Sequence, residues 1–250
     1  MKNRIVLMYH DVYCFSEKES GFQFPTSFPY KISADKFEGH VSFAYNYCKQ
    51  NKIPLETIEF TFDDGGESFY RVIAPILEKY GFKGVFFIST SYIDTDKFLT
   101  KEQIESLYKR GHIIASHSHS HPRNMAKLSE MNLLAEWKES IKILEDIVHS
   151  SITMASIPSG YSSQSVIRTA AKSGIKILYT SKPTDKVTVT KDIEMVGRYV
   201  IHCNTSLDIV RDIISSEWKR KELFIRWNLI AIAKRILGTN YNKIKKRIIQ

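Results

Sequence analysis

Histidine and aspartate residues gather in two short segments whose types and spacing suit metal-assisted hydrolysis. Residues 112–121 hold four of the eight histidines of the chain, three of them alternating in Ser116-His-Ser-His-Ser-His-Pro122. One turn between His117 and His121 could aim both imidazoles at the same point. Two adjacent carboxylates stand in Thr61-Phe-Asp-Asp-Gly65. Divalent first-row metals select imidazole and carboxylate donors, and two His plus one Asp leave positions open for water and substrate.

Each segment also has a simpler interpretation. The Asp64-Gly65 pair could form only the turn that terminates a strand, and the histidines could form a polar surface loop. Adjacent carboxylates on an apolar strand are costly to bury unless something pairs with them. The two segments together therefore favour a metal site.

The elements that position these residues alternate between strands and helices. A capping box at Thr100 and an apolar stripe along residues 134–148 are typical of helices, as are the spacing of Phe37, Val41, Ala44 and Cys48 and the polar start at residues 205–208. Such alternation predicts a parallel sheet with right-handed crossovers, either open and doubly wound or closed into a barrel. Reactive side chains then belong at the carboxyl ends of the strands. Seven short apolar segments are predicted to be strands: residues 5–9, 58–62, 84–88, 113–116, 152–157, 175–179 and 195–201.

The composition is that of a globular α/β protein. The 250 residues are 43% hydrophobic and 25% charged, and this length suffices for a sizeable core. Cys14, Cys48 and Cys203 are too far apart for a disulfide framework. The apolar start at residues 5–9 is too short for a signal sequence, and no apolar run reaches the length of a membrane span. We therefore expect a cytoplasmic protein.

The net charge of +9 is concentrated near the C-terminus. Residues 211–250 hold 11 Lys or Arg and 3 acidic residues, whereas residues 1–210 hold 25 and 24. This distribution argues against nucleic-acid binding by the body of the protein, although binding through the basic end stays open. Residues 223–237 are largely apolar, which predicts either an interfacial helix on an anionic membrane or a final helix packed on the body. We divide the chain into a catalytic domain, residues 1–217, and a basic amphipathic tail, residues 218–250.

The two motifs resemble the first two motifs of the NodB-type polysaccharide deacetylases, carbohydrate esterase family four. The resemblance covers roughly residues 4–215 and implies an α/β fold, a distorted (β/α)7 TIM-like barrel. It implies that Asp63 is the general base and that Asp64, His117 and His121 bind a divalent metal, with Zn²⁺ expected. His119 is not a ligand in the family pattern.

The third family motif, Arg-x-Pro-Tyr-Gly, is only partly matched by Ser156-Ile-Pro-Ser-Gly160. Pro158 and Gly160 match, and the resemblance implies that the Ser159 backbone N–H stabilises an oxyanion. The arginine that positions the base in the family is missing. Arg198 is a candidate replacement, and its alternative interpretation is a surface arginine.

The general acid has two candidates. His10, in Leu7-Met-Tyr-His-Asp-Val12, resembles the acid histidine on the first strand of the circularly permuted poly-N-acetylglucosamine deacetylases. His202 is the nearest match to the C-terminal motif of most family members. We prefer His10, and we expect Tyr9, Pro158, Gly160 and Tyr161 to contact substrate. Residues 15–30 are predicted to be a loop that walls the substrate groove.

The resemblance implies a metal-dependent hydrolase that removes an N-acetyl or N-formyl group from an amino sugar in surface-glycan biosynthesis. If the tail binds a membrane, a lipid-linked glycan is the expected substrate. The alternative is a catalytically inactive, deacetylase-like protein that binds glycans.

Overall fold

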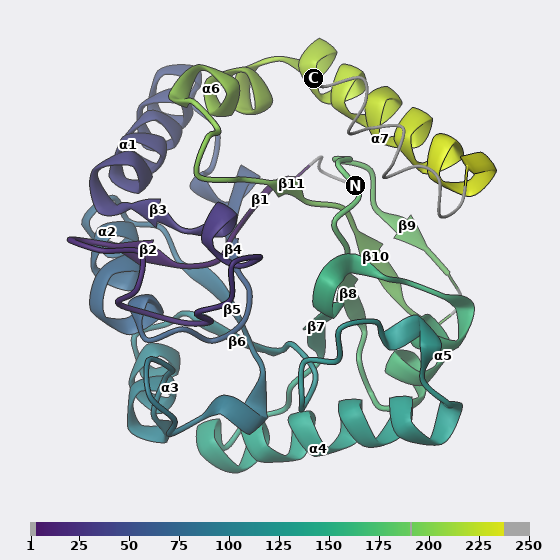
Figure 1. Cartoon of the computed structure of the whole chain (residues 1–250). Coiled ribbons are helices and arrows are strands. Elements are labelled where there is room, and N and C mark those ends of the chain that lie inside the picture. Colours follow the sequence, from purple (N-terminus) through teal and green to yellow (C-terminus); the bar gives the residue numbers. More distant parts are fainter. Residues whose placement is uncertain (1–3, 191, 238–250) are drawn as a thin grey trace.

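The centre of the fold is a curled, mostly parallel sheet. The computed structural model describes residues 4–190 and 192–237. Within them the sheet has nine strands in the order β11-β1-β4-β5-β6-β7-β8-β10-β9, and β9 alone runs antiparallel to its neighbour. Helices surround the sheet on its outer side (Figure 1). The strands are β1 (Ile5–Tyr9), β4 (Ile58–Phe62), β5 (Gly84–Ile88), β6 (Ile113–Ser116), β7 (Met154–Ser156), β8 (Ile177–Tyr179), β9 (Thr188–Val189), β10 (Glu194–Val196) and β11 (Tyr199–Val200).

This architecture confirms the predicted α/β barrel-like fold. The first four predicted strands coincide with β1, β4, β5 and β6, and these strands are buried along most of their length. Strands covered on both faces must be apolar throughout, and this is why the four strands could be predicted from continuous apolar segments of the sequence. A large apolar cluster fills the space between sheet and helices, and a smaller one containing Val6, Phe87 and Tyr179 fills the interior of the curl.

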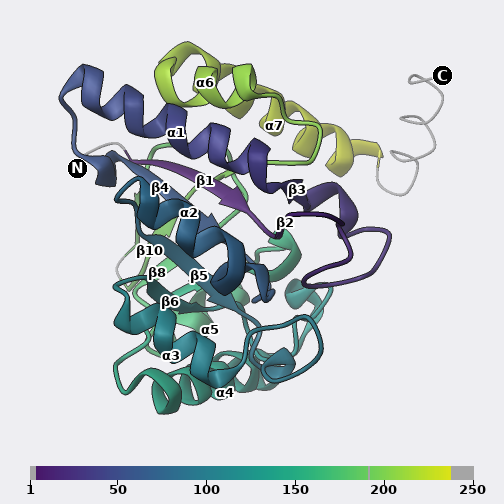
Figure 2. The ribbon, with the colours of Figure 1, turned by 90° about the vertical axis from the view of Figure 1, so that its left-hand side faces the viewer.

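The helices follow their capping signals. The Ser33, Ser129 and Ser206 side chains accept hydrogen bonds from backbone N–H groups in the first turns of α1, α4 and α6. Thr100 and Gln103 form the predicted capping box at the start of α3. Figure 2 shows α1, α2 and α3 side by side along one side of the sheet. The helices are α1 (Ala34–Asn51), α2 (Ala74–Lys79), α3 (Lys101–Lys109), α4 (Glu130–Val148), α5 (Gln164–Lys172), α6 (Leu207–Ser215) and α7 (Glu217–Leu237).

The last predicted strand is interrupted. Residues 195–201 do not form one strand, because β10 pairs with β8 whereas β11 pairs with β1. The chain therefore crosses, at Gly197 and Arg198, the seam between the two halves of the curl. A Cβ on Gly197 would lie 2.4 Å from the Lys182 carbonyl oxygen, so only glycine fits this approach.

The segment between β1 and α1 is fixed to the end of the sheet by a buried polar cluster. Asp11 accepts hydrogen bonds from the Ser20 and Ser68 hydroxyls at 2.7 and 2.8 Å, and the Lys31 ammonium lies 3.9 Å from the same carboxylate. Two short strands, β2 (Val12–Tyr13) and β3 (Ile32–Ser33), pair in parallel at its base. The predicted loop of residues 15–30 is thereby held beside the carboxyl ends of the strands.

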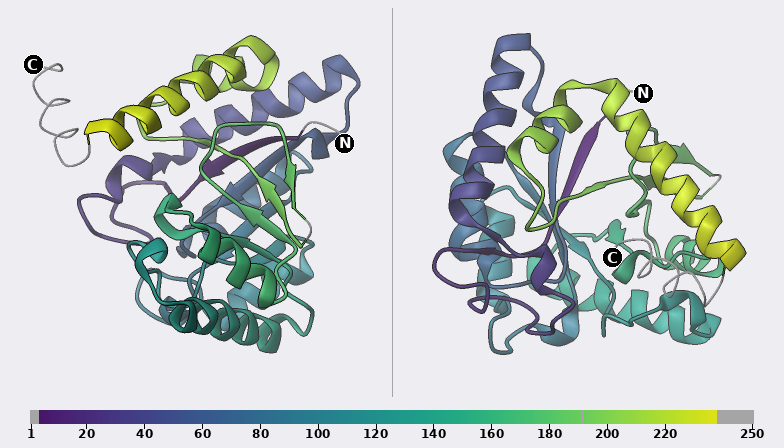
Figure 3. Two further views of the ribbon diagram at one scale, coloured as in Figure 1. Left: turned by 90° about the vertical axis from the view of Figure 1, so that its right-hand side faces the viewer. Right: turned by 45° about the horizontal axis from the view of Figure 1, so that its top comes forward.

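The described chain ends in α7, which follows α6 and runs along the outside of the body (Figure 3). No helix among the described residues has the length and apolarity needed to cross a membrane. The first part of the predicted tail, residues 218–237, lies in α7, and the rest, residues 238–250, lies outside the described residues.

Candidate active site

The two carboxylates lie in a left-handed turn at the end of β4. The Asp63 N–H donates to the Tyr9 carbonyl oxygen at 3.1 Å, which continues the pairing of β4 with β1 by one residue. Asp64 and Gly65 then take φ angles of 89° and 96°. A non-glycine residue at such an angle is strained, and strain of this kind clusters at functional sites. The turn leaves both carboxylates buried.

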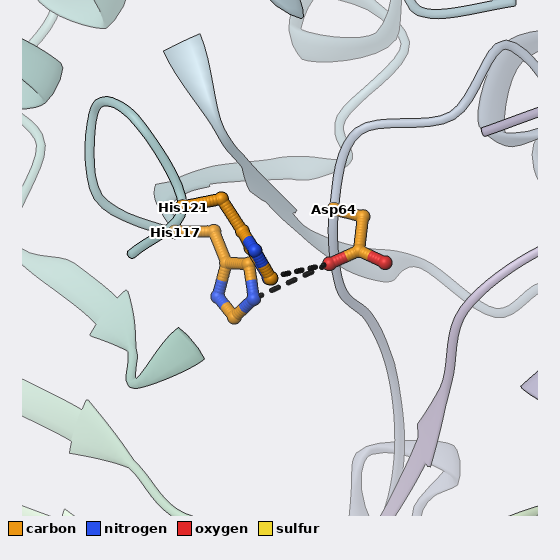
Figure 4. A group of neighbouring side chains, drawn as sticks. All are labelled: Asp64, His117 and His121. Carbon is orange, nitrogen blue, oxygen red and sulfur yellow. Dashed lines mark ion pairs between the residues drawn. The ribbon is translucent and has the colours of Figure 1, made fainter. Parts of the chain in front are cut away.

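Asp64, His117 and His121 converge on one point. The Asp64 Oδ1 atom lies 3.4 Å from His117 Nε2 and 3.2 Å from His121 Nε2 (Figure 4). All three candidate donor atoms lie within 4.8 Å of one another. His117 directly follows β6, and the φ angles of Ser118 and His121, 64° and 54°, turn the chain back so that both imidazoles face Asp64. The structure thus brings together the three residues expected to bind a metal.

Residues outside the site fix the conformation of residues 117–121, the loop that carries the histidines. Glu136 of α4 accepts hydrogen bonds from the backbone N–H groups of His119 and Ser120 at 3.0 and 2.8 Å. The His119 Nδ1 atom lies 2.9 Å from the Thr90 hydroxyl. His119 is therefore engaged away from the three converging side chains.

Ser156 links the proposed base to a proposed ligand. Its hydroxyl donates to Asp63 Oδ1 at 3.2 Å, and its oxygen lies 2.6 Å from His117 Nδ1. Because the hydroxyl proton is directed to Asp63, the network assigns the imidazole proton to Nδ1, from which it is donated to Ser156. The Nε2 lone pair of His117 then faces Asp64 and is free for a metal. This role of Ser156 was not predicted from the sequence, where the only signal is a serine in place of the arginine of the family motif.

Arg198 pairs with Asp63 through both ends of its guanidinium. Nη1 donates to Oδ1 at 2.6 Å and Nη2 to Oδ2 at 2.8 Å. Both side chains are buried, and the guanidinium also lies over the Phe87 ring at 5.2 Å. Arg198 is therefore no surface arginine. The structure places it where the missing motif-three arginine is expected to act.

Charge and burial act together on the titrating groups. Burial alone raises the pKa of Asp63, but the charges of Arg198 and His117 and the hydrogen bonds from Arg198 bring that pKa below its usual value. Burial lowers the pKa of His10, and the charges of Asp64 and Asp63 oppose that shift only in part. The site therefore favours an ionised Asp63.

The converging side chains form the floor of a cleft of about 1270 Å³. His10, Asp63, Ser159, Gly160 and Tyr161 line it, as do several residues of the predicted loop, Phe22 and Tyr30 among them. Ser159 takes a φ of 56° in the short turn Pro158–Gly160. Pro158 is buried and, unlike Gly160 and Tyr161, does not line the cleft, whereas Tyr161 is exposed. The loop of residues 15–30 therefore borders the cleft as predicted.

Both candidate acid histidines reach this cleft. The Tyr30 ring contacts both of them, with ring centroids 4.5 Å from His10 and 4.8 Å from His202. The His10 Nδ1 atom is buried without a hydrogen-bond partner in the described part of the chain. Both histidines therefore stay candidates for the general acid, and His10 directly follows β1, the strand whose Tyr9 carbonyl pairs with the Asp63 N–H.

The structure does not support the predicted contact of Tyr9 with the substrate. Its side chain is buried against Phe37, Phe60 and Phe62, and its hydroxyl lies 3.2 Å from His40 Nδ1. Successive residues of a strand point to opposite faces, so Tyr9 faces the helices while His10 faces the cleft. The structure does not bring Tyr9 to the site.

Comparisons with known proteins agree with the geometry. Residues 50–178 match the polysaccharide deacetylase family. The chain is 26% identical over 192 residues to YxkH of Bacillus subtilis, covering 71% of this chain and 64% of that protein. It is 26% identical over 174 residues to a poly-beta-1,6-N-acetyl-D-glucosamine N-deacetylase of Staphylococcus aureus, covering 59% of this chain and 60% of the relative. The chain thus spans less than two thirds of the length of both relatives.

The fold also resembles solved structures. The deacetylase PplD of Streptococcus pyogenes, solved in complex with acetate, superimposes with a TM-score of 0.67 at 20% identity. The match covers 85% of this chain and 98% of PplD. This similarity establishes the fold.

Proposed function

Because the chain belongs to the polysaccharide deacetylase family, we propose that it is a metal-dependent hydrolase that removes the N-acetyl or N-formyl group of an amino sugar in a surface glycan. The single observation that carries the proposal is the convergence of Asp64, His117 and His121 beside an Asp63 paired with buried Arg198. A metal site next to an oriented carboxylate, at the floor of a cleft, suits the hydrolysis of an acyl group.

The donor set fits a divalent cation, and Zn²⁺ in particular. One carboxylate and two imidazoles are a known ligand set of catalytic zinc, and they leave coordination positions free. The hydrogen bond from His117 Nδ1 to Ser156 leaves the Nε2 atom available as a ligand. A bound cation would supply Lewis acidity, which polarises the acyl carbonyl and stabilises developing negative charge.

Asp63 is the proposed general base. Arg198 and Ser156 fix the carboxylate, and the Arg198 charge keeps it ionised. An ionised, oriented carboxylate can accept a proton from a water molecule that attacks the acyl carbon. Asp63 and the proposed metal ligands all line the cleft, which an acyl group of the substrate can enter.

His10 and Ser159 complete the proposed mechanism. The amine of an amide cannot leave as an anion, so a proton must reach the nitrogen, and His10, directly after β1, is the proposed donor. The Ser159 backbone N–H is the proposed second donor to the oxyanion. Both residues line the same cleft as Asp63.

The cleft also suits a glycan with an apolar part. Tyr30 and Tyr161 offer aromatic rings beside the floor, and Leu223, Trp227 and Ile230 of α7 form an apolar wall. Lipid linkage of the glycan is part of our proposal, supported by this wall. The proposed acyl group is acetyl or formyl, and the two differ by one methyl group.

The test is release of acetate or formate from N-acylated amino sugars, measured together with bound metal. The wild-type protein should release acid and hold metal, Asp63→Ala should hold metal without releasing acid, and His117→Ala should lose both. Met131→Gln, at an exposed position on α4, is the matched control and should behave as the wild type. Metal binding without release from any acylated sugar would contradict the proposal.

A further inference from the structure

Helix α7 carries a row of exposed apolar side chains that do not line the cleft. Trp218, Ile225, Leu229 and Ile232 are 78%, 57%, 61% and 54% exposed. Their spacing of seven, four and three residues places them on one side of the helix. We call these four residues the α7 stripe.

The α7 stripe differs from the side of the helix that borders the cleft. Leu223, Trp227 and Ile230 line the cleft, and helical periodicity places them on another side from the α7 stripe. The Lys182 ammonium lies 5.1 Å from the centre of the Phe224 ring and so links α7 to the body. Figure 3 shows α7 along the outside of the fold. The packing of the described chain therefore leaves the stripe in contact with solvent.

The helix that carries the stripe has a net positive charge, with six Lys or Arg and two acidic residues in residues 217–237. Lys219, Lys221 and Arg226 lie on the same helix, and the helix has only two acidic residues, Glu217 and Glu222. Both acids already pair, with Lys221 at 2.8 Å and Lys219 at 3.0 Å. In the sequence, residues 234–247 hold six Lys or Arg and no acidic residue. An exposed apolar stripe on a helix of net positive charge, followed in the sequence by more cations, matches an anionic lipid surface.

We propose that the α7 stripe docks the protein on an anionic lipid bilayer. The apolar side chains enter the boundary between headgroups and acyl chains, and the cations face the headgroups. A second copy of this chain fits the surface less well, because two cationic helices would face each other with no free acid to pair with. The inference adds to the proposed function, since docking through α7 brings the cleft beside membrane-linked glycans.

The test is flotation of the full chain with phosphatidylcholine vesicles, with and without phosphatidylglycerol. We compare the wild type with Ile225→Gln/Leu229→Gln and with the matched control Met131→Gln/Val189→Gln, which removes exposed apolar side chains elsewhere. The wild type and the control should float with phosphatidylglycerol vesicles, and the bound fraction should fall as salt rises. The α7 double variant should bind at least about tenfold more weakly, because apolar burial is lost.

Other outcomes overturn the proposal. Equal binding of the α7 double variant and the wild type, or equal binding to neutral and anionic vesicles, would remove the role assigned to the stripe or to the charge. A dimer that the α7 double variant abolishes, without vesicle binding by the wild type, would assign the surface to a second copy. Acid release from a water-soluble sugar should be the same in the α7 double variant and the wild type. His117→Ala should still float, so failure of docking is distinguishable from failure of the catalytic proposal.

Discussion

Arg198 forms a bidentate ion pair with the Asp63 carboxylate, although the two residues are 135 positions apart in the sequence. The pair forms two parallel hydrogen bonds at 2.6 and 2.8 Å and is shielded from water. Such a fork fixes both the position and the charge of the carboxylate, which a single point charge cannot do.

Arg198→Lys should lower kcat/KM by about 10- to 100-fold, because one of the two charged hydrogen bonds is lost. Arg198→Met should also lower the free energy of unfolding by about 3–5 kcal/mol, since Asp63 is left buried without a partner. Steady-state kinetics and urea unfolding measure the two effects. Arg168→Lys, in the exposed pair with Glu130, is the control and should change neither. A fully active Arg198→Lys would contradict the positioning role.

Ser156→Ala should weaken zinc binding by about 10- to 100-fold, because His117 loses the partner that fixes its tautomer and orientation. Competition with a chromophoric chelator measures the affinity. Ser173→Ala removes a buried hydroxyl that has no hydrogen-bond partner in the described structure and serves as the control. Equal zinc affinity of the two variants would show that Ser156 does not orient the ligand.

His10→Gln should lower kcat by about 10²- to 10⁴-fold while metal content stays constant, as expected for loss of a general acid. His202→Gln should retain most of the activity, because His10 directly follows β1, whose last residue, Tyr9, accepts a hydrogen bond from the Asp63 N–H. The reverse pattern would transfer the acid role to His202.

The sequence predicted the elements whose signals are local. Strands β1, β4, β5 and β6 are continuous apolar runs, and α3 has its capping box, so neighbouring residues alone define them. The break at Gly197 was not predictable, since the chain changes strand partner there and hydrophobic periodicity carries no information about pairing.

The site was predictable to the extent that its motifs are contiguous. Asp64, His117 and His121 were found because each lies in a short polar cluster after an apolar strand. The roles of Arg198 and Ser156 depend on contacts across 135 and 93 residues, which a single sequence does not reveal. Tyr9 was misassigned because its position at a strand end was considered without the alternation that turns its side chain away.

Acid should destabilise the fold through buried histidines. Burial, with a smaller effect of the Lys36 charge, lowers the pKa of His40 to about 4, and burial lowers that of His112 to about 4 although Glu78 opposes it. The unfolded chain binds these protons near pH 6.5, so the free energy of unfolding should fall as pH drops from about 6.5 toward 4. Urea unfolding at several pH values measures this slope. His40→Gln should flatten it, and an unchanged slope in that variant would assign the acid sensitivity to other groups.

The position of Arg198 in the interrupted last strand has a consequence for the order in which the site is synthesised. Residues 64, 117 and 121 leave the ribosome well before Arg198, which stands between β10 and β11, the last two strands of the sheet. A nascent chain can therefore contain all three proposed metal ligands while Asp63 still lacks its guanidinium partner. The proposed hydrolysis therefore requires the chain through β11 to be present, and not only the strands that carry the two motifs.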